Sequence, residues 1–224
     1  MRNLVIFSIV FAFSAAALPA AAENAAPAEG LVKTFYPAGQ IKEEKNYKEG
    51  KLDGVYKAYY ESGSVQQEVP YVDGTIDGTA KKFRPDGRIE VECAYKKGQK
   101  HGPRKAYSKN GTVIEDENFR NGKLHGTRMI YDGDKGFLMA EGRYVDGKRE
   151  GRHAMYTPEG RVMFETEYKD DLKNGTDKLY NILTGQLQSV YVYAGDKKEG
   201  KAVFYDDRGK IYRTEIYKND QLAG

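Results

Sequence analysis

The feature that most constrains this chain is a pair of glycines that returns every 24 or 25 residues. The frame reads aromatic-x-x-Gly-x-x-x-Gly, and YVDGTIDG, which begins at Tyr71, is one copy of it. The second glycine recurs at this interval from Gly30 to Gly224. A fixed period of this length indicates a repeat protein whose units pack mainly on their neighbours. The frame glycines between the two ends are Gly54, Gly78, Gly102, Gly126, Gly151, Gly175 and Gly200.

Each unit repeats two aromatic positions, which we call the first and second rungs. Since every unit keeps them, we expect them to form structural ladders that pack along the repeat in place of a conventional core. The first rung, five residues after the frame glycine, is Phe35, Tyr59, Phe83, Tyr107, Tyr131, Tyr156, Tyr180 and Tyr205. The second rung, which opens the next frame, is Tyr47, Tyr71, Tyr95, Phe119, Tyr144, Tyr168, Tyr193 and Tyr217.

Each unit is predicted to be a β-hairpin. The segments between glycines are short and rich in Tyr, Phe, Val and Ile, which favours strands over helices. Pro37, Pro85 and Pro158 stand two residues before a glycine, and this spacing predicts a three-residue loop with a glycine bulge. The frame itself is expected to be a longer joint to the next hairpin. The predicted fold is all-β, an elongated twisted antiparallel sheet of about eight tandem hairpins.

The first turn also predicts which residues share a face. Counting outward from it puts Phe35 opposite Ile41. Strict alternation then places a row of lysines on the first-rung side and a row of acidic residues on the other face. The lysines are Lys33, Lys57, Lys81, Lys105 and Lys178. The acidic row is Glu44, Glu68, Glu92, Asp116, Glu141 and Glu165.

The N-terminus is predicted to be a secretory signal peptide over residues 1–22. Arg2 precedes an apolar run from Leu4 to Phe13, and an A-x-A cleavage pattern ends at Ala22. The run is shorter than the roughly 20 residues that a membrane-spanning helix needs. We therefore expect an exported protein, periplasmic or secreted, with a short leader at 23–29 and repeats over 30–224.

Composition bounds the classes of partner. The chain holds 36 Lys+Arg and 33 Asp+Glu, and these charges alternate along the sequence instead of clustering. A nucleic-acid-binding protein would gather its basic residues on one face, so we expect no nucleic-acid partner. Hydrophobic residues make up only 39% of the chain, which favours a thin structure with much surface. Cys93 is the only cysteine, so no intramolecular disulfide forms.

The frame, together with a Glu-x-x-Tyr ending in most second strands, resembles the MORN repeat and in particular its bacterial variant. Glu44–Tyr47 and Glu68–Tyr71 are examples of this ending, and Val190 and Thr214 replace the glutamate in the last two units. The resemblance covers residues 30–224 and implies a ribbon that serves as a binding surface. Proteins with this variant are often labelled antitoxin-like. Asp171, Asp196 and Asp220 depart from the pattern by replacing a frame glycine.

No motif in the sequence predicts catalysis, a metal site or a cofactor. Equivalent histidines, His101 and His125, are expected about 10 Å apart, too far to share a zinc ion. The Asp73–Gly78 segment lacks the spacing of a calcium loop. Cys93 has no assignable catalytic partner. The acidic row could bind cations or a basic partner, or it could pair with the lysines. We therefore expect a protein that is not an enzyme.

The leading hypothesis is an exported interaction scaffold or adaptor that binds another protein. One alternative is binding to a phospholipid surface, and another is an antitoxin-like or immunity protein that neutralises a toxin. A last strand with an open edge also predicts self-association through the C-terminal edge. The residues expected to set specificity, because they differ between units, are Tyr36, Tyr56, Tyr60, Arg84, Met129 and Met163.

Overall fold

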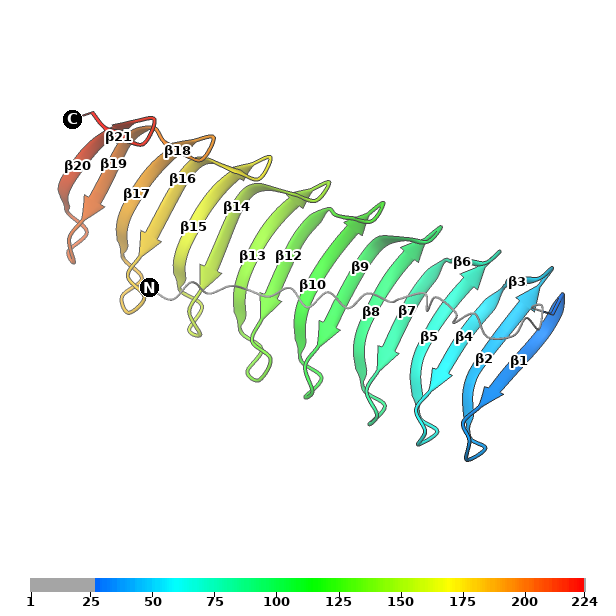
Figure 1. The fold of residues 1–224 in the computed structure, drawn as a ribbon. Helices are drawn as coiled ribbons and strands as arrows, with labels where there is room; N and C mark the ends of the chain where they lie inside the picture. Colours follow the sequence, from blue (N-terminus) through cyan, green and yellow to red (C-terminus); the bar gives the residue numbers. More distant parts are fainter. Residues whose placement is uncertain (1–26, 224) are drawn as a thin grey trace.

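The computed structural model describes residues 27–223, which form one open antiparallel sheet. Consecutive hairpins lie side by side from β1 and β2 at one end to β19 and β20 at the other, so the molecule is an elongated ribbon (Figure 1). None of the described residues forms a helix long and apolar enough to cross a membrane. The all-β hairpin ribbon is confirmed. The predicted signal peptide and most of the leader lie outside the described residues, as does Gly224.

Each hairpin has a first strand and a second strand. Four short strands lie between hairpins, and a fifth follows the last hairpin. The first strands are β1 (Glu29–Phe35), β4 (Gly54–Tyr59), β7 (Gly78–Phe83), β9 (Gln99–Tyr107), β12 (Gly126–Tyr131), β14 (Lys148–Tyr156), β16 (Leu172–Tyr180) and β19 (Gly200–Tyr205). The second strands are β2 (Ile41–Lys48), β5 (Val65–Val72), β8 (Ile89–Lys96), β10 (Val113–Arg120), β13 (Leu138–Val145), β15 (Val162–Lys169), β17 (Leu187–Ala194) and β20 (Ile211–Lys218). The short strands are β3 (Lys51–Leu52), β6 (Thr75–Ile76), β11 (Lys123–Leu124), β18 (Lys197–Lys198) and β21 (Gln221–Leu222).

The turn inside six of the eight hairpins is the predicted three-residue loop. In the first hairpin, the Tyr36 amide donates to the Gln40 carbonyl at 2.8 Å, and the Gly39 amide donates back to Tyr36 at 2.9 Å. Gly39 has φ +93°, a left-handed conformation that glycine adopts without steric cost. Two hairpins carry a fourth loop residue, because Gly136 bonds to Asp132 and Gly185 bonds to Asn181. The insertion therefore lies in this loop.

The joint between hairpins is tighter than the long loop expected from sequence. Its two central residues both have positive φ, 48° at Glu49 and 73° at Gly50, which is the pattern of a two-residue type I′ turn. Strand pairing resumes at once, with Lys48 opposite Lys51. The second frame glycine, Gly54, then takes φ +103° and turns the chain into the next first strand. The prediction of a longer joint was wrong, since the right-handed twist of the flanking strands favours the type I′ turn.

The three aspartates that replace a frame glycine keep the same turn. Asp171, Asp196 and Asp220 have φ between 67° and 72°, a conformation that aspartate tolerates better than most residues. Each side chain also accepts a hydrogen bond from a backbone amide of the preceding unit. Lys173, for example, donates its amide hydrogen to Asp196 Oδ1 at 2.6 Å. The carboxylate thus adds a bond between neighbouring turns that glycine cannot make.

We expect Asp196→Ala to destabilise the ribbon more than Asp196→Gly. Alanine loses the bond to Lys173 and is strained at positive φ, at a cost of about 1–2 kcal/mol. Glycine loses only the bond, which contributes about 1 kcal/mol or less at this exposed position. Urea unfolding followed by circular dichroism checks the order. Equal midpoints for the two variants would contradict the role of the left-handed conformation.

The acidic row lies on the same face as the lysines, and the expectation that it would face the other side was wrong. Each second strand carries a β-bulge near its start. In the first hairpin, Phe35 lies opposite Ile41 but Thr34 lies opposite Glu43, so Lys42 is the extra residue. One inserted residue reverses the alternation of every residue after it. Glu44 consequently stands directly opposite Lys33.

These residues build an ionic ladder on the side that we call the first-rung face. Lys33 Nζ lies 2.8 Å from Glu44, and Lys178 Nζ lies 2.8 Å from Glu165. Several acidic residues of the ladder also accept a hydrogen bond from the hydroxyl group of a first-rung tyrosine in the next hairpin. The tyrosine–glutamate pairs are Tyr59–Glu44 at 2.8 Å, Tyr107–Glu92 at 2.6 Å, Tyr156–Glu141 at 2.5 Å and Tyr180–Glu165 at 3.1 Å. The first rung therefore links consecutive hairpins through hydrogen bonds as well as packing.

We expect the contribution of Glu165 to stability to disappear in acid. Burial raises the pKa of Glu165, but hydrogen bonds from Lys178 and Arg152 outweigh it and lower the pKa to about 2. A lowered carboxylate pKa stabilises the fold above the unfolded value, 4.5, and this stabilisation is lost as pH falls toward 2. The difference in unfolding free energy between the native protein and Glu165→Gln should thus vanish within this window. A difference that stays constant from pH 7 to pH 2 would contradict the ladder.

Burial concentrates on the opposite face, which carries the second rung and which we call the second-rung face. Nearly all buried apolar side chains point to it because they share the alternation of the second-rung aromatics. They are Ala58, Val69, Ala80, Val91, Cys93, Ala106, Ala140, Ala202 and Phe204, while Ala154 is buried on the first-rung face. Most of these side chains are small, as a single sheet without a covering layer requires. The two aromatic rungs therefore pack on opposite faces.

Candidate functional site

One row of residues crosses the second-rung face at right angles to the strands and changes character halfway along the ribbon. Cα pairing joins its members one by one. Up to β10 the row is mostly polar or small, comprising Thr34, Glu43, Ala58, Gln67, Lys82, Val91, Ala106 and Glu115. From β12 to β19 it reads Ile130, Ala140, Met155, Phe164, Leu179, Ser189 and Phe204. We call this second part the apolar band.

The apolar band is long and partly open to solvent. Its seven strands at ~4.8 Å spacing give a length of roughly 29 Å. Phe164 is 37% exposed and Leu179 is 48% exposed. Ten of the 14 exposed large apolar side chains in residues 27–223 lie at or beyond Phe164, and two of these ten, Phe164 and Leu179, belong to the band. An extended apolar surface of this kind on a polar protein marks an interaction site.

A hollow interrupts the apolar band at β13. Ala140 and Gly142 occupy its floor, at positions where the preceding hairpin has Glu115 and Glu117 and the following one has Phe164 and Thr166. Because this is the smallest pair at these two positions, space is left above it. The hollow has a volume of about 230 Å³ and lies between β12 and β15.

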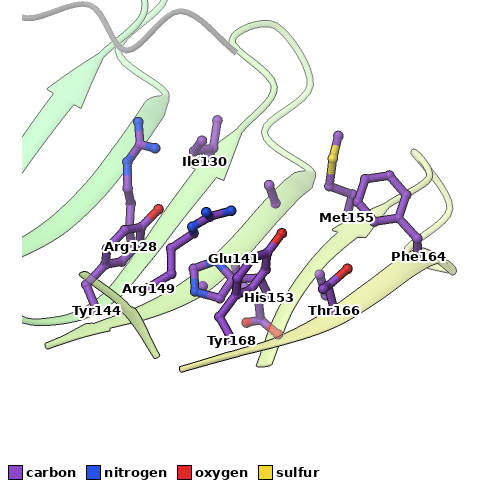
Figure 2. Close-up of a pocket in the computed structure, with 13 residues that line it drawn as sticks. Arg128, Ile130, Glu141, Tyr144, Arg149, His153, Met155, Phe164, Thr166 and Tyr168 are labelled. Carbon is purple, nitrogen blue, oxygen red and sulfur yellow. The ribbon is translucent and has the colours of Figure 1, made fainter. Parts of the chain in front are cut away.

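The hollow has an apolar end and a polar end. Figure 2 shows Met155 and Phe164 on one side and Ile130 with Arg128 on the other, while Arg149, His153 and Tyr168 lie together at the polar end. Its remaining lining residues are Ala140, Glu141, Gly142, Tyr144, Ala154 and Thr166. A ligand that joins an apolar group to a polar one matches this division.

His153 is held between two second-rung tyrosines. Its ring centroid lies 5.2 Å from that of Tyr144 and 5.0 Å from that of Tyr168, both edge to face. Gly142 makes room for it, because a Cβ at residue 142 would lie 2.0 Å from His153 Nδ1. Burial lowers the pKa of His153 from its usual 6.5, so the ring is neutral at pH 7. Nε2 lies 2.9 Å from the Arg143 carbonyl oxygen and must carry the proton, since that oxygen only accepts.

Beside the hollow lies a buried cluster of two arginines and two glutamates. Arg104 Nη1 donates to Glu115 at 2.8 Å and to Glu117 at 2.7 Å. Arg128 donates to the same two carboxylates, through Nε at 2.7 Å and Nη2 at 3.1 Å. The side chains of Arg104 and Glu117 are each 4% exposed. Four charges that cancel and bond one another can remain ionised at this depth. The cluster fixes Arg128 at the rim of the hollow.

The residues predicted to set specificity do not form one patch. Tyr36, Tyr60 and Arg84 lie near the hairpin loops, where each donates a hydrogen bond to a backbone carbonyl of the next hairpin at 2.7–2.8 Å. Tyr56 donates to Glu43 at 2.8 Å on the second-rung face. Met129 lies on the first-rung face, opposite Glu141.

Met163 is the member of this set that lies next to the apolar band. It precedes Phe164 at the bulge of β15, and equivalent bulge residues contact the same row in other hairpins. Glu90 lies 2.8 Å from Lys82, and the ring centroid of Tyr212 lies 6.4 Å from that of Phe204. The band itself was not predicted. Its signal in the sequence is the run of apolar residues at the position just before the first rung, from Ile130 onward. Once the bulge is counted, these residues lie in one row with residues of the second strands.

Chemistry other than binding has little support in residues 27–223. No three His, Cys, Asp or Glu in that range lie close enough to hold a metal ion. Cys93 is 1% exposed, and burial raises the pKa of its thiol. His125 Nδ1 lies 3.3 Å from Asp146, at a turn.

Four segments of the chain match the model of the MORN repeat variant, at residues 28–49, 52–73, 100–121 and 198–219. They correspond to the hairpins β1–β2, β4–β5, β9–β10 and β19–β20. MORN repeats generally serve binding to proteins or membranes and not catalysis, so the matches indicate a binding protein. The lining of the hollow, from Arg128 to Tyr168, falls wholly between matched segments.

No curated protein matches the chain. Among solved structures, the Glycosylation Associate Protein complex from Streptococcus agalactiae shares 19% identity over 47% of this chain and 20% of that chain, with a TM-score of 0.29. A S. aureus TarM mutant in complex with Fondaparinux, alpha-GlcNAc-glycerol and UDP shares 8% identity over 55% of this chain and 21% of that chain, with a TM-score of 0.26. The chain thus spans about a fifth of the length of each of these solved chains.

Proposed function

We propose that this chain is an exported, non-enzymatic interaction scaffold that binds another protein through the apolar band. The observation that carries the proposal is the change along one row of the second-rung face. The row is polar or small through Glu115 except at Val91, and it is apolar from Ile130 to Phe204 except at Ser189. The fold itself does not require this change, since the N-terminal hairpins form with the polar version of the same row.

A protein partner fits this surface better than a membrane does. Anionic lipid attracts clustered basic residues that lack nearby acids. Here several cations of the second-rung face have acidic neighbours. Arg149 Nε lies 3.3 Å from Asp171, and Lys173 Nζ pairs with Asp177. The neutralisation of a toxin is one form of this function, in which the partner would be an exported toxin.

Affinity capture with matched variants tests the proposal. The tagged mature chain is expressed in its native host, and the proteins that co-purify are compared for three versions. Leu179→Glu places a charge in the apolar band. Lys82→Glu changes the equivalent first-strand residue in the N-terminal half of the same row. We expect one dominant protein to co-purify with the native chain and Lys82→Glu, and to be lost with Leu179→Glu.

Two outcomes would count against this function. One is a set of co-purifying proteins that is the same for all three versions. The other is recovery of phospholipid with no protein, followed by flotation of the purified chain with liposomes at low salt and its release at high salt. The second outcome would support the membrane alternative.

A further inference from the structure

The charged side chains that reach into the hollow are both cationic. Arg128 and Arg149 line it from the second-rung face. Glu141 also lines the hollow, but its carboxylate is on the first-rung face, where it accepts bonds from Arg152 at 2.6 Å and Tyr156 at 2.5 Å. His153 is neutral. Each guanidinium is paired with carboxylates outside the lining, Glu115 and Glu117 for Arg128 and Asp171 for Arg149. The hollow is therefore lined by guanidinium donors, which an anionic acceptor would complement.

Arg149 is oriented for such a group. Its Nε and Nη2 donate to Oδ1 and the carbonyl oxygen of Asp171 at 3.3 and 2.7 Å. Its guanidinium carbon lies 3.9 Å from the ring centroid of Tyr168, which holds the plane of the guanidinium over the ring. Its Nη1 has no hydrogen-bond partner within the described part of the chain, 27–223. A fixed guanidinium with one free nitrogen is a ready donor to a carboxylate.

The apolar end of the hollow lies across the face from Arg149. Met155 and Phe164 are Cα partners on β14 and β15, and Ile130 faces them from β12. The hollow has a volume of about 230 Å³. This is a size for one large side chain and a neighbouring carboxylate, and it is small for a folded domain. The rest of the apolar band continues from Phe164 toward Leu179.

We propose that the hollow binds an acidic and apolar peptide segment of the partner protein, with a carboxylate on Arg149 and an apolar side chain against Met155 and Phe164. This inference rests on the proposed protein-binding function and names the chemistry of the partner. The segment continues along the apolar band toward β19.

A peptide array provides the probe. Each nine-residue peptide carries one glutamate and one leucine at a varied spacing, with a terminal tryptophan as fluorophore. The chain contains no tryptophan, so tryptophan anisotropy reports the peptide alone. Matched peptides replace the glutamate by glutamine. A charge-assisted hydrogen bond is strong enough that we expect about tenfold or tighter binding for the glutamate peptide at the best spacing.

Two variants and one control assign the contact. Arg149→Gln should remove the preference for glutamate over glutamine, and Phe164→Ala should weaken both peptides equally. Lys100→Gln is the matched control, because Lys100 holds the equivalent position at β9, with its ammonium 5.0 Å from the centroid of Phe119 and outside the hollow. It should leave both affinities unchanged. Circular dichroism confirms that each variant is folded.

Several results would overturn the inference. They are equal affinity for glutamate and glutamine peptides, an equal effect of Lys100→Gln and Arg149→Gln, or no binding of any peptide in the array. Arg149-dependent binding to mixed phosphatidylcholine and phosphatidylserine vesicles in place of peptides would also overturn it. If a protein co-purifies with the native chain but not with Leu179→Glu, and no peptide in the array binds, the protein-binding function stands. Only the proposed chemistry of the bound segment is then wrong.

Discussion

Glu117→Ala should lower the free energy of unfolding by about 3–5 kcal/mol, because it breaks a buried ion cluster from the inside. Glu117 accepts bonds from Arg104 at 2.7 Å and from Arg128 at 2.7 Å. Without it, two guanidinium groups share the single carboxylate of Glu115 in a site where water has little access. Urea unfolding followed by far-UV circular dichroism measures the loss.

The control for this experiment is an exposed ion pair on the same strand. Arg120 Nη2 lies 2.9 Å from Asp146, with side chains 47% and 55% exposed. Water screens such a pair, so Arg120→Ala should cost less than about 1 kcal/mol. A loss for Glu117→Ala as small as that for Arg120→Ala would show that the cluster is solvated and that Arg128 is not fixed at the rim of the hollow.

Gly142→Ala should cost about 1–3 kcal/mol and displace His153 from between its two tyrosines. The added Cβ would lie 2.0 Å from Nδ1 and 2.7 Å from Cγ of that ring, so the ring must move. Residue 142 does not have a left-handed backbone, and the effect therefore comes from space alone. The displaced ring enters the hollow, so binding there should also be lost.

Two further variants separate this crowding from a general effect of replacing glycine. Gly133 also lacks a left-handed backbone, and a Cβ there would make ordinary contacts at 3.5 Å, so Gly133→Ala should be close to neutral. In the double variant Gly142→Ala with His153→Ala, the clash is gone, and the cost should be smaller than the sum of the two single costs. Additive costs would mean that Gly142 and His153 do not compete for the same space.

The period of 24 or 25 residues was enough to predict the hairpin ribbon and its loops. Glycines with positive φ, such as Gly39 and Gly54, recur at fixed intervals because each hairpin needs them at the same two bends. Between these bends the segments are too short for anything but strands. Turn-forming residues and the repeat are both features of the sequence, so this level of structure could be predicted.

The assignment of faces failed at one residue per hairpin. The extra residue, Lys42 in the first hairpin, has no distinctive type and leaves no mark in the sequence. The bulge in each hairpin nevertheless sets the register. It places Glu44 opposite Lys33 in the first hairpin and Ile130 opposite Ala140 in the fifth. The ionic ladder and the apolar band could not be predicted from the sequence for this reason, because both rows form only in the correct register.

The hollow depends on contacts that no repeat pattern contains. The small pair Ala140 and Gly142 is visible when the units are compared, but the position of the His153 ring over Gly142 is a tertiary result. The same holds for Tyr36 and Tyr60. Their variation between units suggested a recognition role, whereas their hydroxyl groups bond to backbone carbonyls of the neighbouring hairpin.

The most direct test of the binding surface is site-specific photo-crosslinking in living host cells. A photoreactive amino acid replaces Leu179 in the apolar band or, in a second strain, Lys82 in the polar half of the same row. We expect irradiation to give one dominant covalent adduct with another protein from position 179 and none from position 82. Equal adducts from both positions, or adducts with lipid alone at position 179, would contradict the claim that the apolar band binds a protein.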